Sequence, residues 1–238
     1  AGGCVVTAHQ AGDATYGPAP DALRGFIISK ATQTIADFAL PVGKIYGDQA
    51  FDVSTTSSSG LLVKFAGKGA CSVQGTTVTI TGAGLCQVTA SQAGDGNFGP
   101  AADVVRDATI GKAAATVSFD AGTLAQIYDG KVKTVATTTA PGVFSVKLNF
   151  TGTPRSAGSF PVTATIVDDN HEGSASDTLV IGKADATVVV APYSVVYDGS
   201  AHSATVTSIT GVNGETGATV GTVDVSNTTH TAAGTFAT

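Results

Sequence analysis

Two of the three cysteines, Cys71 and Cys86, are placed to form a disulfide bond across a predicted β-hairpin. The hairpin turns at Gln74-Gly75, and Cys86 lies on the same side of its strand as Val88, since successive strand side chains point to opposite faces. A disulfide closing a loop of about 15 residues stabilises a fold by about 3 kcal/mol in the chain-entropy model, and small extracellular β domains are its usual setting. We predict a Cys71–Cys86 disulfide, with two buried free thiols as the alternative.

One cluster of oxygen-bearing side chains has a composition that could bind calcium. It consists of Asp168, Asp169, Asn170 and Glu172. Calcium takes about six to eight oxygen ligands in proteins. However, an aspartate followed by a ring also recurs in three loops, as Asp13 with Tyr16, Asp95 with Phe98 and Asp169 with His171. A side-chain turn closed by the ring explains this pattern, so we predict no metal site and keep calcium as the alternative.

The remaining polar residues do not have the spacing of a catalytic or cofactor site. Four histidines occupy unrelated positions without the spacing of metal ligands: His9, His171, His202 and His230. The sequence contains no nucleophile elbow and no phosphate-binding or dinucleotide-binding glycine motif. We predict that the chain is not an enzyme and uses no cofactor.

The charge and hydropathy of the chain argue against two further classes of partner. Only 13% of the 238 residues are charged, the net charge is -6, and no basic run is present. Nucleic-acid binding requires clustered Lys or Arg, so no nucleic-acid partner is expected. The longest apolar stretches, such as 186–191, are far shorter than the ~20 residues of a membrane helix, so no membrane insertion of this segment is expected.

The hydrophobic residues alternate along short segments, which predicts β-strands. Val146, Leu148 and Phe150 alternate with polar residues, and a second alternating run extends over 160–166. Turn signals such as Asn213-Gly214 separate the runs. About seven short strands in roughly 70 to 80 residues, without a helical pattern, favour an all-β immunoglobulin-like antiparallel sandwich.

Internal repeats organise these predicted strands. The segment 4–19 recurs at 86–101 with a constant offset of 82 residues. A Lys-Ala pair marks each junction, at 30–31, 112–113 and 183–184, and a tyrosine turn follows it. The three turns are Tyr46-Gly47-Asp48, Tyr128-Asp129-Gly130 and Tyr197-Asp198-Gly199. We expect the tyrosine to pack on the sandwich and the Asp and Gly to form a tight turn, with ligand stacking as the alternative.

The repeats divide the chain into four predicted segments. Residues 1–31 are closing strands of a preceding repeat, 32–113 and 114–184 are complete repeats, and 185–238 is a repeat without its closing strands. Cys4 is equivalent to Cys86, so it is unpaired here and its partner is expected outside these residues. Because no Gly/Ser/Pro spacer separates the repeats, we predict an extended rod of sandwiches, each roughly 30 Å long.

These residues resemble the bacterial immunoglobulin-like repeats known as MBG and YDG domains, which occur in tandem in large secreted or surface-anchored adhesins. The turn at Tyr46 is similar to the YGX type, and those at Tyr128 and Tyr197 are similar to the YDG type. The segment from Cys71 through Cys86 is similar to the paired-cysteine hairpin of related surface repeats. The resemblance implies an extracellular or bacterial cell-surface location.

Two functions are compatible with these features. The first is a structural shaft of a secreted or surface-attached adhesin or extracellular filament, whose partners are neighbouring repeats or other copies of the chain. The second is an adhesin module that binds host or matrix glycan or protein through loops at a sandwich end. Whether the terminal segments are completed within one chain or by strand donation between chains stays open.

Overall fold

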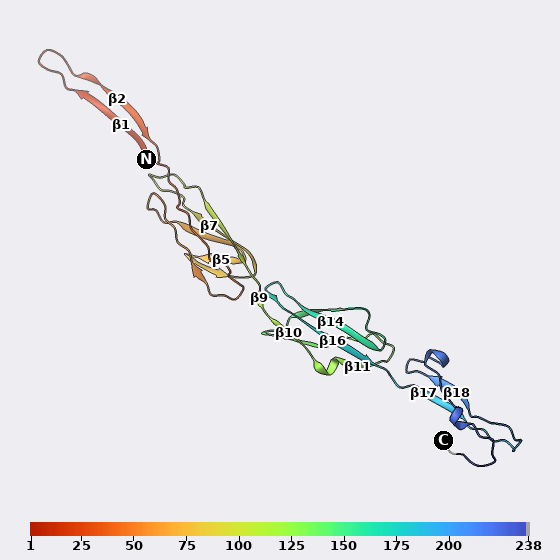
Figure 1. Ribbon diagram of the computed structural model, residues 1–238. Helices are drawn as coiled ribbons and strands as arrows, with labels where there is room; N and C mark the ends of the chain where they lie inside the picture. Colours follow the sequence, from red (N-terminus) through yellow and green to blue (C-terminus); the bar gives the residue numbers. More distant parts are fainter. Residues whose placement is uncertain (237–238) are drawn as a thin grey trace. The chain divides into compact units, whose positions relative to one another are not determined.

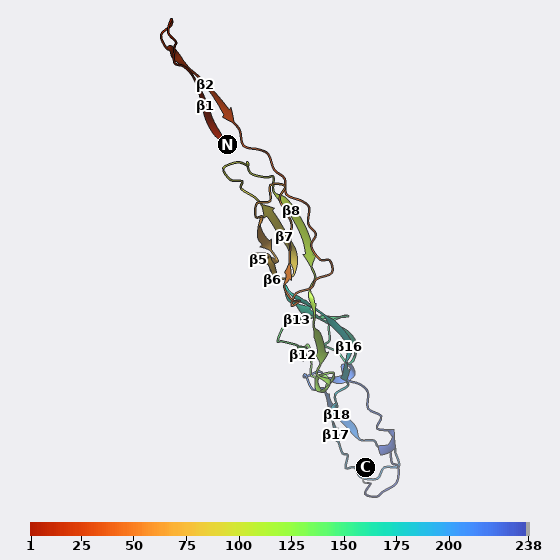
Figure 2. The same ribbon diagram turned by 90° about the vertical axis from the view of Figure 1, so that its left-hand side faces the viewer.

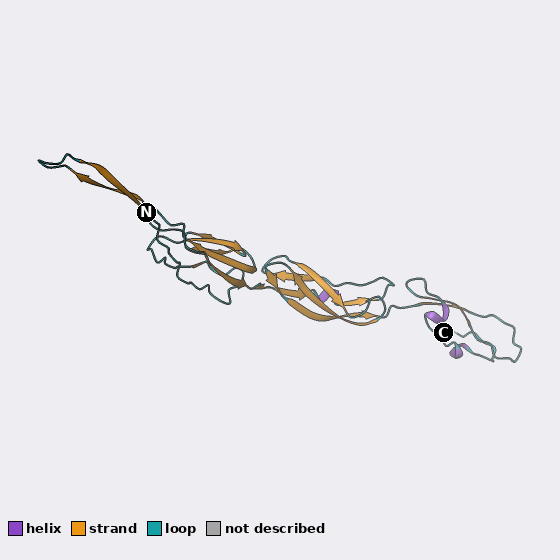
Figure 3. Ribbon diagram, turned by 90° about the horizontal axis from the view of Figure 1, so that it is seen from above, coloured by secondary structure: helices purple, strands orange, loops and turns teal. Residues whose placement is uncertain are grey.

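The fold consists of β-strands (Figure 1). The computed structural model describes residues 1–236, and the helices within that range are short 3-10 turns, shown in purple in Figure 3. These turns are η1 (Ala121–Thr123), η2 (Gly217–Thr219) and η3 (Ser226–Thr228). The predicted all-β class is confirmed. No helix in the described range is long and apolar enough to cross a membrane.

The chain forms two compact units. Unit 1 comprises Ala1–Ala114 together with Asp168–Glu172, and unit 2 comprises Ala115–Val167 together with Gly173–Thr238. The division into four repeat segments stays a prediction.

Unit 1 contains one hairpin and two three-stranded sheets (Figure 2). The hairpin pairs β1 (Gly2–Gln10) with β2 (Ala19–Ile28). The first sheet has the order β3-β6-β5, with β3 at Phe51–Asp52, β5 at Cys71–Gln74 and β6 at Thr77–Ile80. The second has the order β4-β7-β8, with β4 at Lys64–Gly69, β7 at Gly84–Ser91 and β8 at Val104–Ile110.

Residues from both of these sheets form one hydrophobic core in unit 1. Val78 of the first sheet and Cys86, Val88 and Ala90 of the second are each 0% exposed. The two sheets therefore bury one face each against a shared core, an arrangement consistent with a β-sandwich.

A short parallel pair brings residues 168–172 into unit 1. In it, β15 (His171–Glu172) lies beside β9 (Ala113–Ala114). The Asn170 side-chain oxygen accepts a hydrogen bond from the Ala83 N–H at 2.8 Å. The backbone carbonyl of Asn170 accepts one from the Ala113 N–H at 2.8 Å. This loop is thus fixed to unit 1 through backbone groups.

Unit 2 is built around a four-stranded sheet with the order β11-β16-β14-β13. Its strands are β11 (Ala125–Ile127), β13 (Ser145–Phe150), β14 (Gly158–Val167) and β16 (Ser174–Gly182). A two-stranded sheet of β10 (Thr116–Phe119) and β12 (Thr137–Ala140) accompanies it. Side chains at alternate positions of β14, from Val162 to Ala164 and Ile166, are buried, which confirms the predicted alternation there.

The C-terminal part of unit 2 buries much less apolar surface. Its strands, β17 (Thr187–Ala191) and β18 (Thr205–Thr210), pair antiparallel in a two-stranded sheet. Val188, Val189 and Val190 are each 41–50% exposed, and no buried hydrophobic cluster of the described chain includes residues after 181. The apolar residues of this segment therefore do not form a packed core within the described chain.

Candidate functional site

The predicted disulfide is present and joins the two sheets of unit 1. Cys71 on β5 is bonded to Cys86 on β7, with Cα atoms 5.2 Å apart and 15 residues of separation. The two side chains are 4% and 0% exposed. The bond therefore lies inside the core and serves as a crosslink, which confirms the predicted pairing and excludes the alternative of two free thiols.

The hairpin that carries Cys86 occurs twice in unit 1 with the same backbone register. Cys4 lies opposite Phe26 in the β1–β2 pair, and Cys86 lies opposite Ala108 in the β7–β8 pair. With the sequence offset of 82 residues, the other strand pairs match in the same way, from Gly2–Ile28 to Ala8–Ala22. The repeat seen in the sequence is therefore also a repeat of strand pairing.

The loops at the tips of these two hairpins share one side-chain turn. Asp13 Oδ1 accepts hydrogen bonds from the Thr15 and Tyr16 N–H groups, each at 2.8 Å. Asp95 Oδ1 accepts bonds from the Asn97 and Phe98 N–H groups in the same way. These N–H donors stabilise the charged carboxylates and lower the pKa of both aspartates.

In the third loop the aspartate that makes this turn is Asp168, so the expectation that placed Asp169 there is wrong. Asp168 Oδ1 accepts a hydrogen bond from the Asn170 N–H at 2.9 Å and lies 2.7 Å from Nδ1 of His171. The His171 contact is the main reason that the pKa of Asp168 is lowered. The spacing from Asp168 to His171 is three residues, the same as from Asp13 to Tyr16 and from Asp95 to Phe98.

The calcium candidate gains no support from the placement of its oxygen atoms. Asp168 Oδ1 already accepts a hydrogen bond from the Asn170 N–H within the turn, and Asn170 Oδ1 accepts one from the Ala83 N–H. Within residues 1–236, no group of three or more His, Cys, Asp or Glu side chains is placed to hold a metal ion. The four histidines are likewise not gathered into such a group in that range.

The three tyrosine turns differ in backbone and in how the tyrosine is covered. The glycine with positive φ is two residues after the tyrosine at Gly130 and Gly199, with φ of 77° and 78°, but directly follows it at Gly47, with φ of 90°. The Tyr46 ring contacts His171 edge-on, with centroids 5.4 Å apart. Tyr197 is 67% exposed, so the expectation that each tyrosine packs on a sandwich is wrong for this turn.

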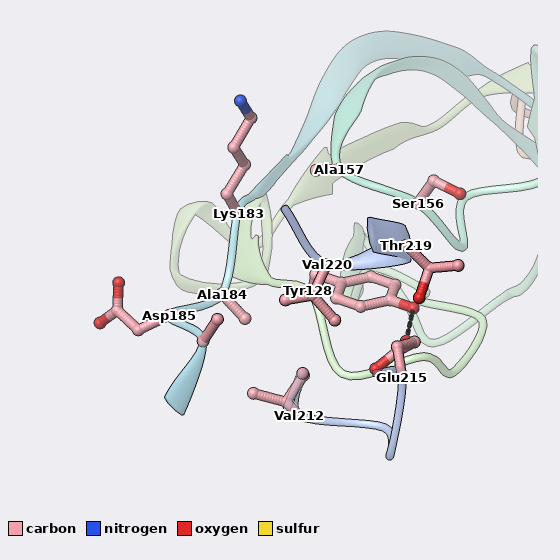
Figure 4. Close-up of a pocket in the computed structure, with 12 residues that line it drawn as sticks. Tyr128, Ser156, Ala157, Lys183, Ala184, Asp185, Val212, Glu215, Thr219 and Val220 are labelled. Carbon is pink, nitrogen blue, oxygen red and sulfur yellow. Dashed lines mark hydrogen bonds between the residues drawn. The ribbon is translucent and has the colours of Figure 1, made fainter. Parts of the chain in front are cut away.

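Tyr128 lines a concave site within unit 2 (Figure 4). Its hydroxyl donates a hydrogen bond to Glu215 Oε1 at 2.6 Å. In Figure 4 the side chains of Lys183 and Asp185 point away from this pair. The cavity has a volume of about 360 Å³ and is otherwise lined mainly by small residues such as Ala157, Ala184 and Gly211.

A charged hydrogen bond and nearby packing both stabilise the contact between Tyr128 and Glu215. The Tyr128 hydrogen bond lowers the pKa of Glu215, and the same bond raises the pKa of Tyr128. A Cβ at Gly130 would lie 2.4 Å from Cγ of Asn213, so any other residue there would require the Asn213 side chain to move. The turn at Tyr128 therefore docks against the turn at Asn213-Gly214.

Sequence analysis did not identify Glu215 as a partner of Tyr128. The only usable signal was the Asn213-Gly214 turn, which predicts a change of chain direction but not which tyrosine the following carboxylate reaches. The corresponding contact of Tyr46 is made by a histidine from a different loop, so the repeat pattern offers no template for it.

Comparison with known families supports the resemblance for one part of the chain. Residues 115–185 match the family model of the MBG domain. The matched range includes the Tyr128-Asp129-Gly130 turn and the strands from β10 to β16. No curated protein matches the chain. Residues 115–185 are thus similar in sequence to an MBG domain, and their fold is all-β.

Proposed function

We propose that this chain is a structural shaft segment of a secreted or surface-attached bacterial adhesin or extracellular filament, built from immunoglobulin-like repeats in series. The observation that carries the proposal is the closing hairpin, which occurs twice with one register. A structure that is copied along a chain suits a spacer, whereas a catalytic site needs a unique arrangement of groups.

The connections between the repeated elements support a mechanical role. Only residues 111–115 separate β8 from β10, and only residues 183–186 separate β16 from β17. Part of the first connection is itself paired, through β9. Short connections leave few freely rotating backbone bonds, whereas Gly/Ser-rich linkers behave as flexible coils.

Small-angle X-ray scattering tests this proposal directly. A compact globule of 238 residues has a radius of gyration of about 18 Å. Three sandwich-sized segments in series would span roughly 90 Å, so we expect a larger radius and a maximum dimension of that order. A dilution series controls for association. A compact particle, or the scattering of a flexible coil, would contradict the shaft.

An extracellular location is part of the proposal. It is supported by the MBG match at 115–185 and by the buried Cys71–Cys86 bond, since structural disulfides persist in oxidising compartments. Antibodies against the chain should label intact producing cells or their shed material. Labelling that requires permeabilised cells would contradict this location.

The cavity at Tyr128 favours one alternative, a binding module for host or matrix glycan. Its volume of about 360 Å³ falls within the range of small-ligand pockets. Tyr128 is its single aromatic side chain, and its hydroxyl is already used by Glu215. Reproducible glycan-array binding that is lost in Ala184→Leu, which adds bulk to the cavity wall, but kept in Val196→Ala, an exposed residue outside the lining, would favour this alternative.

A further inference from the structure

The β1–β2 hairpin carries an apolar face that the described chain does not cover. Val6, Phe26 and Ile28 on this face are 52–55% exposed. No residue of β1 or β2 belongs to a buried hydrophobic cluster of residues 1–236. The opposite face also exposes Val5, Leu23 and Ile27, at 59–82%. Exposed apolar surface of this kind indicates an interaction surface, and the second copy of the hairpin identifies which face binds.

The second copy of the hairpin shows what such a face binds. Cys86, Val88 and Ala90 of β7 are each 0% exposed, and Ile110 of β8 is 2% exposed. They correspond to Cys4, Val6, Ala8 and Ile28, because both hairpins have the same register. The face that the β7–β8 hairpin buries is therefore exposed on the β1–β2 hairpin.

Three contacts hold the β7–β8 hairpin in unit 1. Strand β4 pairs antiparallel with β7, from Lys64–Ser91 to Gly69–Cys86. Cys71 is bonded to Cys86. The guanidinium of Arg106 on β8 forms an ion pair with Asp37. A paired edge strand, a disulfide and an ion pair thus all attach the β7–β8 hairpin to the rest of unit 1.

We propose that the β1–β2 face docks an immunoglobulin-like half-sandwich, meaning the strands that precede the closing hairpin in such a domain. The partner supplies a strand antiparallel to β1, a cysteine opposite Cys4 and a carboxylate opposite Arg24. Arg24 is equivalent to Arg106 and lies opposite Val6. Within residues 1–236 it has no ion-pair partner.

A second copy of this chain does not offer the required chemistry. The sequence has three cysteines, and two of them are bonded to each other inside the core of unit 1. The third is Cys4 itself, so two copies can join only as a Cys4–Cys4 dimer. The inference rests on the proposed shaft for its biological setting. The contacts that it assigns to the partner are those that the β7–β8 hairpin makes within unit 1.

A peptide with the sequence of Val63–Gln74 provides the probe, because it contains the β4 strand and Cys71. The 238-residue chain is incubated with this peptide in a glutathione redox buffer, and intact mass with peptide mapping measures the mixed disulfide at Cys4. We expect at least about tenfold more adduct than with a scrambled peptide of the same composition, which corresponds to a tenfold difference in equilibrium constant. Cys71 of the chain is 4% exposed, so its own disulfide is protected from exchange.

Two variants on neighbouring positions test the face itself. Val6→Asp changes the docking face, and Val5→Asp changes the opposite face of the same strand; both valines are exposed, at 55% and 63%. Neither substitution removes core packing, so both variants should fold. We expect Val6→Asp to remove the tenfold preference and Val5→Asp to keep it.

Three outcomes would overturn the inference: equal adduct with the scrambled peptide, loss of preference in both variants, or Cys4–Cys4 dimers as the main product. The last outcome would assign the face to a second copy. Failure here leaves the shaft proposal standing if scattering shows an extended chain, and a compact particle rejects the shaft whatever the peptide does.

Discussion

The Cys71–Cys86 bond is the only covalent link between distant positions in the described chain. Replacing both cysteines by Ala should reduce the free energy of unfolding of unit 1 by about 3 kcal/mol, because the loop-closure entropy of the unfolded chain is restored. Denaturant unfolding measures the change. Cys4→Ala is the matched control and should have no comparable effect, since this thiol is unbonded. Equal stabilities for all three proteins would contradict the crosslinking role.

The Tyr128–Glu215 hydrogen bond should make stability depend on pH in a defined direction. The Glu215 carboxylate has a folded-state pKa below the usual 4.5. Its stabilisation of the fold is therefore fully present above pH 4.5 and is lost as the pH falls through the lowered pKa. The phenol has a folded-state pKa above 10.0, so its contribution is present below that pH and is lost as the pH rises.

Thermal melts of the chain and of Tyr128→Phe test this pH dependence. From about pH 5 to 9 we expect the Tm of Tyr128→Phe to lie below that of the unmodified chain by a small, constant amount. Below about pH 5 this difference in Tm should shrink. Tyr197→Phe is the control, because Tyr197 is 67% exposed and has no hydrogen bond in the described range. A difference of the same size at acid pH would assign the effect of Tyr128→Phe to packing rather than to the charged hydrogen bond.

The strands of unit 2 stabilise the fold through alternate side chains. Leu179 on β16 is 0% exposed and belongs to the core, whereas its neighbour Val180 is 47% exposed. Leu179→Ala should lower the free energy of unfolding by about 2–5 kcal/mol through lost burial and a cavity. Val180→Ala should change it by less than about 0.5 kcal/mol. Similar losses in calorimetry or denaturant unfolding would show that β16 does not have one buried face.

The strands and the crosslink could be predicted because their signals are local. Alternation in β13 and β14 and the parity of Cys86 depend only on the period of a strand. The Tyr128–Glu215 contact could not be predicted, since it joins two turns far apart in sequence. Asp168 could have been identified in place of Asp169, because it has the same three-residue spacing to a ring as Asp13 and Asp95. The high exposure of β17 could not be predicted, because burial of a strand also requires other strands that cover it.

The two compact units should unfold in separate transitions. The disulfide lies in unit 1, and the core containing Leu179 lies in unit 2. No hydrophobic cluster of the described residues contains members from both units, so loss of one core removes little packing from the other. Larger chains with separate cores commonly depart from two-state unfolding.

Differential scanning calorimetry with one chemical and one genetic perturbation tests this independence. Reductant should lower the Tm of one transition, and Leu179→Ala should lower the Tm of the other. With the core of each unit separate, applying both should give the sum of the two effects, as expected for distant sites. A single transition that moves as a whole under either perturbation would mean that the units fold cooperatively, and a force applied to such a chain would have to unfold both together.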